Sequence, residues 1–175
     1  MDSENLIIKA KGGNKEAFVS LMSLYERDMY NLSKHMLGNT DFIYDVVQET
    51  IITAYQKIGT LKNAASFKSW LIKILINKCK THLHKESKVT YLDEEIVIPT
   101  RDESLERVEI YELLKKLPED FRAVLILFYF NDFNYKEISE ILNIPEGTVK
   151  SRLFRSKAQL YEMINCKEEK RYEKL

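Results

Sequence analysis

Apolar residues recur every three or four positions over most of the chain, and short stretches rich in glycine or polar residues separate the runs. This spacing is typical of amphipathic helices that turn one face to a core. In the first half of the chain it predicts helices over residues 3–11, 15–37, 41–58 and 67–84. Thr40 and Ser66 are the expected N-caps of the third and fourth helices, because their hydroxyls can accept a backbone hydrogen bond. Four such helices are enough for one small bundle.

The periodicity disappears over residues 86–103, and Pro99 prevents a continuous helix through this stretch. A segment of this length is long for a loop inside one domain. We therefore interpret it as a flexible linker between two small domains, residues 1–85 and residues 104–165. Lysine and glutamate dominate after residue 165, so residues 166–175 are expected to be a charged tail that frays.

The second domain is predicted to contain shorter helices, over residues 105–116, 119–130 and 135–142, and a last helix from Gly147 onward. Pro118 separates the first two of these helices, as proline at a helix start often does. A turn of about four residues separates the last two, which is the arrangement of a helix-turn-helix. The sequence thus predicts an all-α protein with two small helical domains joined by a flexible linker, the C-terminal one containing a helix-turn-helix.

The charges of the chain are segregated along its length. Its 175 residues carry 27 basic and 27 acidic side chains, so the formal net charge is zero. Residues 66–90 nevertheless hold six lysines against one acid, a local charge of +5, and residues 91–112 hold eight acids against two arginines, a local charge of −6. Because local fields act on a partner more strongly than the total, the zero sum does not exclude a nucleic acid. The acidic stretch is either a shield for the basic helix or a solvated connector.

Membrane, metal and enzyme classes are not indicated. The longest apolar run, Ala123–Phe130, is far shorter than the ~20 residues that span a bilayer, and no export signal precedes it. We therefore expect a cytoplasmic protein that does not bind membranes directly. Cys79 and Cys166 are far apart, and His82 and His84 point to different sides of one helix, so neither a disulfide nor a metal site is expected. No nucleophile or glycine-rich phosphate loop is recognisable, so we expect no enzyme and no cofactor.

The last predicted helix has the chemistry of a DNA-recognition helix. Between Gly147 and Leu160 it holds four basic residues and no acid. In a helix-turn-helix, the N-terminal half of the second helix enters the major groove, where arginine, lysine, serine and threonine can contact base edges. The candidate contacts in this half, with a phenylalanine able to touch a thymine methyl, are Thr148, Lys150, Ser151, Arg152, Phe154 and Arg155.

The fourth predicted helix has a polar and basic stripe. Lys73, Asn77 and Lys80 follow one another at helical spacing and therefore share a face that suits a phosphate backbone. The loop before this helix holds three further candidates, Lys62, Asn63 and Ser66, which could line a pocket for an unstacked base. Phe67 and Trp70 are either base-stacking residues or core residues, and their spacing favours the core.

The third predicted helix carries a polar, acidic face. Asp45, Gln48 and Glu49 lie at positions i, i+3 and i+4 and therefore point to the same side. From the residues alone, this side is either a solvated face or a pair of carboxylates for acid/base catalysis, and no nucleophile or second ligand cluster supports catalysis.

Several of these stretches together resemble a known family. They are Asp45-Val-Val-Gln48-Glu49, Phe67-Lys-Ser-Trp70-Leu71 followed by Asn77, Leu117-Pro118-Glu119, Tyr135-Lys-Glu-Ile-Ser-Glu-Ile-Leu, and Gly147-Thr-Val-Lys-Ser-Arg-Leu-Phe-Arg155. In this order, over about residues 3–163, the chain is similar to the extracytoplasmic-function (ECF) sigma factors of the sigma-70 family. The resemblance implies a region 2 domain in residues 1–85 and a region 4 domain in residues 104–165.

The resemblance also implies partners. A sigma factor binds core RNA polymerase and directs it to promoters, and Asp45, Gln48 and Glu49 match the part of region 2 that docks on the clamp helices of the largest polymerase subunit. The flap of the second-largest subunit is the expected partner of region 4. Members of the family are commonly held inactive by an anti-sigma factor, often one anchored in the membrane. We expect a monomer when the protein is free.

Promoter contacts follow from the same resemblance. The residues that match the −10 element contacts, including capture of a flipped base, are Lys62, Asn63, Ser66, Lys73, Asn77 and Lys80. The residues that match the −35 element contacts are Thr148, Lys150, Ser151, Arg152, Phe154 and Arg155. The chain departs from the family after Asn77, because Thr81 and His84-Lys85 stand where the family often has an acid and a pair of arginines. Contacts at the end of that helix are therefore the least supported.

Two other functions fit part of the sequence. A conventional helix-turn-helix regulator would bind operator DNA without polymerase, usually as a dimer. A helical adaptor would bind protein alone. Neither function requires a basic, asparagine-bearing helix after a polar loop, so the first domain favours the sigma factor.

Overall fold

The computed structural model describes residues 3–38, 40–89 and 105–172, and within these ranges the chain is helical and contains no strand. It divides into two compact units, residues 1–33 with 40–94 and residues 34–39 with 95–175. The all-α prediction, with two helical regions, is confirmed. Each unit is described by itself below.

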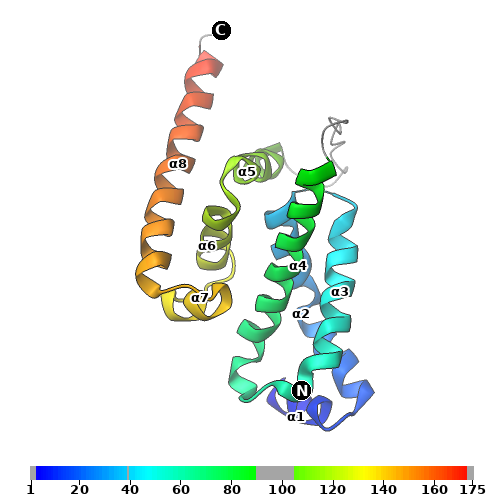
Figure 1. The fold of residues 1–175 in the computed structure, drawn as a ribbon. Coiled ribbons are helices and arrows are strands. Elements are labelled where there is room, and N and C mark those ends of the chain that lie inside the picture. Colours follow the sequence, from blue (N-terminus) through cyan, green and yellow to red (C-terminus); the bar gives the residue numbers. More distant parts are fainter. Residues whose placement is uncertain (1–2, 39, 90–104, 173–175) are drawn as a thin grey trace. The chain divides into compact units, whose positions relative to one another are not determined.

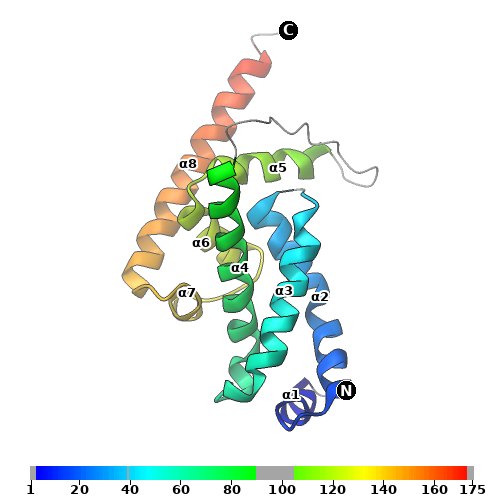
Figure 2. The same cartoon turned by 45° about the vertical axis from the view of Figure 1, so that its right-hand side comes forward.

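The first unit is built from four helices and two short 3₁₀ turns. The helices are α1 (Ser3–Lys11), α2 (Lys15–Leu37), α3 (Phe42–Lys57) and α4 (Phe67–Val89), and the turns are η1 (Ile58–Thr60) and η2 (Ala64–Ser66). Helices α2, α3 and α4 run side by side (Figures 1 and 2). Helix α1 packs against η1 and η2, the two turns that connect α3 to α4.

An apolar core holds these helices together. Leu21, Leu32, Ile43, Leu71 and Leu75 are almost fully buried. Each buried side chain of this size contributes about 1.5–3 kcal/mol through removal of apolar surface from water. The predicted apolar stripes therefore face inward as expected.

Phe67 belongs to this core and Trp70 to its edge. The Phe67 side chain is 1% exposed, whereas Trp70 is half-buried. The Phe67 ring lies 5.3 Å from the ring of Tyr25 and 5.7 Å from that of Trp70, measured between centroids. The interpretation of Phe67 as a core residue rather than a base-stacking residue is confirmed.

The ends of α3 and α4 differ from the prediction. Asp41, not Thr40, occupies the N-cap of α3, and its side chain makes no capping hydrogen bond. Helix α4 continues to Val89, so residues 86–89 are helical rather than part of the linker, and residues 90–103 lie outside the described residues. The apolar periodicity fades near His84, but glutamate and lysine are themselves good helix formers, so the helix continues beyond the periodic pattern.

The second unit contains α5 (Leu105–Lys116), α6 (Glu119–Tyr129), α7 (Tyr135–Leu142) and α8 (Glu146–Tyr172). Helices α5, α6 and α7 all pack on α8. Buried side chains at Leu114, Val124, Ile138, Val149 and Leu153 form the core between them. Figure 1 shows α7 as the short helix between α6 and the long α8.

Helix α8 is longer than predicted. It begins at Glu146, one residue before the expected start, and continues to Tyr172. The prediction of a frayed tail is therefore wrong for residues 166–172, while residues 173–175 lie outside the described part of the chain. Lysine and glutamate, which suggested a tail, are themselves good helix formers.

Local polar contacts fix the helix-turn-helix. The Asn134 Oδ1 atom accepts a hydrogen bond from the Glu137 backbone N–H at 3.0 Å, and Glu137 Oε2 accepts one from the Asn134 N–H at 2.9 Å. This reciprocal capping box starts α7. Asn143 ends it in the left-handed region with φ 54°, which asparagine tolerates better than most residues. The turn is therefore specified by its own residues.

A buried arginine joins α5 to α6. Arg122 Nη2 donates hydrogen bonds to the carbonyl oxygens of Lys115 at 2.7 Å and Leu117 at 3.1 Å, at the C-terminal end of α5. Burial lowers the pKa of the Arg122 guanidinium, and the nearby Glu119 carboxylate opposes this shift. A cation at a helix C-terminus also interacts favourably with the helix dipole. Arg122 is thus a charged cap shared by two helices.

We predict that Arg122→Met destabilises the second unit. Methionine fills similar space but leaves the Lys115 and Leu117 carbonyls without their buried donor, so the free energy of unfolding should fall by about 1.5–3 kcal/mol. Urea denaturation followed by circular dichroism measures this loss. Lys116→Met, at an exposed neighbour, is the control and should change stability by less than about 0.5 kcal/mol. Equal stability of the two variants would contradict the capping role.

Candidate nucleic-acid interface

The N-terminal half of α8 presents a polar and basic face. Lys150, Ser151, Phe154 and Arg155 are exposed, and Phe154 is 76% exposed. The buried positions between them hold Val149, Leu153 and Ser156. Four of the six predicted −35 residues therefore share one solvent-facing side.

Two of these exposed side chains have local contacts that orient them. The Lys150 ammonium lies over the Tyr135 ring, 5.5 Å from its centroid, and the Tyr135 ring stacks on Phe128 of α6 with centroids 5.3 Å apart. Ser151 Oγ donates a hydrogen bond to the Thr148 carbonyl oxygen at 3.0 Å. A cation–π contact at an exposed site contributes about 0.5–1 kcal/mol, enough to favour one orientation of Lys150. Sequence reasoning did not identify Tyr135 as a support for Lys150.

The remaining two predicted residues lie at the edge of this face. Thr148 is half-buried. Arg152 Nη2 lies 2.8 Å from Asp120 Oδ2, and its side chain is 25% exposed. Arg152 therefore turns toward α6 rather than straight to solvent.

Helical spacing and burial differ at Lys157 of α8. Its spacing from the buried Val149 and Leu153 predicts an inward stem, but Lys157 is exposed, and its ammonium lies 5.9 Å from the centroid of the Tyr129 ring. Ser156 is the buried residue of this turn, and its Oγ donates to the Leu153 carbonyl oxygen at 2.9 Å. The short serine fits the interior because its hydroxyl is satisfied within the helix.

In the first unit, the loop between α3 and α4 is held in place by buried Leu61 and by helix α1. Lys62, Asn63 and Ser66 are all exposed, while Leu61 is buried beside them. Asn63 Oδ1 accepts a hydrogen bond from the Ala65 N–H at 3.0 Å and so caps η2. Helix α1 packs against this turn. The three predicted residues thus lie on a fixed support, and the role of α1 in it was not predicted.

The polar stripe on α4 has the predicted register. Asn77 is exposed, and Lys73 and Lys80 are partly buried on the same helix. Partial burial of lysine usually involves its aliphatic stem, which packs on apolar surface while the ammonium reaches water. The stripe can therefore present two cations and one amide to a strand that lies along α4.

The acidic face of α3 is exposed as predicted. Asp45, Gln48 and Glu49 all face solvent. Glu49 Oε2 lies 3.1 Å from the Lys78 ammonium of α4, with side-chain exposures of 58% and 32% for the two residues. Glu49 therefore has a structural contact within the unit.

The same side of α3 also carries large, exposed apolar side chains. The sequence analysis did not identify these apolar residues. Tyr44 is 66% exposed, Ile52 56% and Tyr55 48%. With Gln48 they stand at positions i, i+4, i+8 and i+11, so they form one stripe along α3. Exposed apolar stripes of this kind are typical of protein-binding surfaces.

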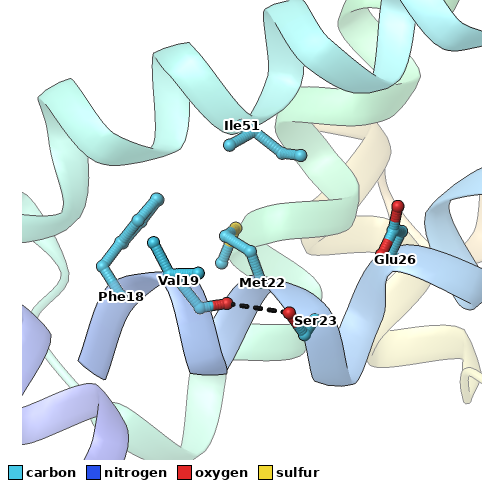
Figure 3. Close-up of a pocket in the computed structure, with 6 residues that line it drawn as sticks. All are labelled: Phe18, Val19, Met22, Ser23, Glu26 and Ile51. Atoms are coloured by element: carbon cyan, nitrogen blue, oxygen red, sulfur yellow. Dashed lines mark hydrogen bonds between the residues drawn. The ribbon is translucent and has the colours of Figure 1, made fainter. Parts of the chain in front are cut away.

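A groove lies beside this stripe, between α2 and α3. It has a volume of about 200 Å³. Figure 3 shows its lining residues, Phe18, Val19, Met22, Ser23 and Glu26 from α2 and Ile51 from α3. Ring contacts between Tyr30 and Tyr44 and between Phe18 and Tyr55 join the same two helices.

The described residues offer neither a metal-binding cluster nor a membrane-spanning helix. They contain no group of three or more histidine, cysteine, aspartate or glutamate side chains that could hold a metal ion. Cys79 is buried, with its thiol 4.0 Å from Ser33 Oγ, and Cys166 is exposed. No helix in the described ranges is long and apolar enough to cross a bilayer.

Comparison with known proteins decides the family. Residues 21–89 match the model of Sigma-70 region 2, and residues 107–160 match the model of Sigma-70, region 4. The ECF RNA polymerase sigma factor SigW of Bacillus subtilis is 31% identical to this chain over 178 residues, covering 90% of this chain and 94% of that protein. The chain belongs to the ECF sigma factors.

Other similar proteins agree with this assignment. The ECF RNA polymerase sigma-E factor of Haemophilus influenzae is 28% identical, covering 94% of this sigma factor and 96% of that protein. The structure of RpoE in complex with the anti-sigma factor NepR, from Bartonella quintana, has a TM-score of 0.73, 24% identity, and coverage of 85% and 96%. That of CnrH in complex with the cytosolic domain of CnrY has a TM-score of 0.74, 20% identity, and coverage of 94% and 99%. At these identities the two structures show the shared fold.

The family assignment confirms the resemblance found in the sequence. The sigma factor carries region 2 in its first unit and region 4, with the helix-turn-helix, in its second. It is a polymerase-associated transcription initiation factor. The individual DNA- and polymerase-contacting residues remain predictions, which the surfaces above allow us to test.

We predict that the two acids of the α3 face differ in their effect on stability. Glu49→Lys replaces the ion pair with Lys78 by a repulsion and should lower the free energy of unfolding by about 0.5–1 kcal/mol. Asp45→Lys, on the same face, should change it by less than about 0.5 kcal/mol. Urea denaturation of both variants makes the comparison. A larger loss for Asp45→Lys would show that this acid, rather than Glu49, has the structural role.

Proposed function

We propose that this sigma factor binds core RNA polymerase through the α3 face, reads the −35 element with α8 and opens the −10 element with the α3–α4 loop and α4. The observation that carries the proposal is the exposed basic face of α8, presented by a helix-turn-helix whose turn is fixed by the Asn134 capping box. An arrangement of this kind places the N-terminal half of the second helix in the major groove.

For the −35 element, direct readout falls to the most exposed side chains. Lys150 and Arg155 can donate to guanine O6 and N7, Ser151 can contact either base of a pair, and Phe154 can contact a thymine methyl. Thr148, at the edge, fits a phosphate contact. Base contacts give the sequence preference and phosphate contacts give the register.

For the −10 element, the first unit offers a loop and a basic stripe. An unstacked base can be held by Lys62, Asn63 and Ser66, which lie on the supported α3–α4 connection. The backbone of the same strand can then follow Lys73, Asn77 and Lys80 along α4. Flipping a base costs a few kcal/mol, which pocket and backbone contacts offset. Opening therefore proceeds by binding, without a covalent step or a cofactor.

For the polymerase, the α3 face combines acids with an apolar stripe. Asp45, Gln48 and Glu49 suit a basic partner surface, and Tyr44, Ile52 and Tyr55 supply apolar contact area. Aromatic anchors surrounded by polar residues are typical of the energetic centres of interfaces. We assign this face to the clamp helices of the largest subunit, and region 4 to the flap of the second-largest subunit.

A protein inhibitor is part of the proposal. RpoE is described as a complex with the anti-sigma factor NepR, and CnrH as a complex with the cytosolic domain of CnrY. We infer that an anti-sigma factor, anchored in the membrane or soluble, covers the same exposed face of α3. The sigma factor would then act in the cytoplasm, where RNA polymerase is, as a monomer once released.

In vitro transcription tests the function. Purified core RNA polymerase is given a pool of promoter fragments from the source genome, with and without this protein. Specific transcripts that require the protein are the expected result, and their aligned upstream sequences give the −10 and −35 elements. DNA binding without any new transcript would instead favour a conventional helix-turn-helix regulator.

We predict that Asp45→Lys weakens polymerase binding. Reversal of an exposed charge at the proposed interface should lower affinity for core RNA polymerase by about tenfold, while the fold is retained. Competition against an unrelated sigma factor in a transcription assay measures the affinity. Glu162→Lys, an equal reversal on the exposed side of α8, is the control. Equal competition by both variants would remove Asp45 from the interface.

We predict that Asn63 acts through its amide during promoter opening. Asn63→Asp keeps the oxygen that caps η2 but loses the amide N–H donors, whereas Asn63→Ala loses both. If the amide holds a flipped base, both variants should slow opening by about tenfold, with initial duplex binding unchanged. Permanganate footprinting of unpaired thymines over time provides the rate. A normal rate for Asn63→Asp would reduce the role of Asn63 to that of a cap.

A further inference from the structure

One basic residue of the recognition helix has a carboxylate partner on another helix. Arg152 Nη2 lies 2.8 Å from Asp120 Oδ2, and the two side chains are 25% and 44% exposed. Lys150 and Arg155, one turn away or less on the same helix, are exposed. Arg152 thus differs from these two neighbours because its side chain points toward α6 and its charge is paired with a carboxylate.

Asp120 is well placed to hold this arginine. It stands in the first turn of α6, where the helix dipole favours a negative charge. Hydrogen bonds fix the backbone of this first turn, because the Pro118 carbonyl accepts from the Phe121 and Arg122 N–H groups, both at 2.9 Å. The carboxylate therefore sits on a rigid element and not on a mobile loop.

We propose that Asp120 is a positioning residue for −35 recognition, which acts by holding Arg152 against α6 and so fixes how α8 presents its reading face. This inference rests on the proposed function of α8. On this assignment Arg152 reads no base; Lys150, Ser151, Phe154 and Arg155 do. The pair connects the two helices at the level of the recognition residues.

The pair should improve discrimination between DNA sequences rather than affinity. A free arginine at the groove edge would contact phosphates of any sequence, which strengthens non-specific binding. Pairing with Asp120 removes that contribution and restrains α8 on α6, so that the base contacts are made in one register. Breaking the pair from either side should then weaken selectivity at all −35 positions together, because the whole helix shifts. Loss of a base contact would affect one position alone.

The test uses holoenzyme assembled from core RNA polymerase and the full-length protein. Transcription is measured from a promoter identified by the in vitro transcription test of the proposed function. It is also measured from a panel of variants of that promoter, in which each −35 base pair is changed in turn. We expect Asp120→Asn and Arg152→Gln each to lower the ratio between intact and changed promoters by about threefold to tenfold at every position that the wild type reads. The double variant should lose no more than either single variant, since both break the same contact.

Three further variants separate this role from others. Asp120→Glu keeps the carboxylate and should retain most of the wild-type selectivity. Asp132→Asn removes an equal charge from an exposed loop position after α6, at a φ of 57° that asparagine tolerates, and should behave as wild type. Arg155→Ala, at a proposed base reader, should lose selectivity at one position and so shows that the panel can detect direct readout.

Different results would overturn different statements. If Arg152→Gln loses selectivity at a single position and Asp120→Asn resembles wild type, Arg152 is a base reader and the inference is wrong. Additive losses in the double variant would also overturn it, because Asp120 would then act independently of Arg152. A wild-type holoenzyme that ignores every −35 change would overturn the proposed role of α8 itself, and the inference with it.

Discussion

The region 4 unit depends on the buried guanidinium of Arg122. By donating to the carbonyls at the end of α5 from a position on α6, it ties the first turn of α6 to the end of α5. Helix α6 then supplies both supports of the recognition surface, since Phe128 stacks beneath Tyr135 and Asp120 pairs with Arg152. The helix that Arg122 fixes therefore supports side chains on α7 and α8, the next two helices along the chain.

The first unit carries opposite charges on two neighbouring helices, α3 and α4. The acids of α3 and the lysines of α4 attract one another, and Glu49 and Lys78 form an ion pair between the two helices. Asp45 and Asn77 stay exposed on their own helices. The acidic and basic stretches of the sequence therefore form separate surfaces of the folded unit. One small bundle carries an acidic face on α3 and a basic stripe on α4.

Much of the fold could be predicted because local signals mark it. Glycines end α1 and α2, and Asn134 begins α7, so these boundaries agree with the sequence to the residue or nearly so. The end of α4 and the tail of α8 were missed, since a polar helix lacks the periodicity that reveals a buried face. The direction of Arg152 could not be predicted, because its partner Asp120 is distant in sequence and helical spacing gives a side, not a contact. The stripe of Tyr44, Ile52 and Tyr55 was missed for another reason: the periodic pattern marks the buried side of α3, and it does not show that the opposite side also carries large apolar residues.

The continuity of α8 has a mechanical consequence. Its 27 residues run from Glu146 to Tyr172 without a break, which corresponds to a rod of about 40 Å. A rod transmits rotation: a small tilt at the end that meets DNA sweeps the opposite end through a wider arc. Exposed Tyr161 and Ile164 project from the same helix beyond its proposed DNA-binding half, so any tilt of α8 in that half also moves these two apolar side chains.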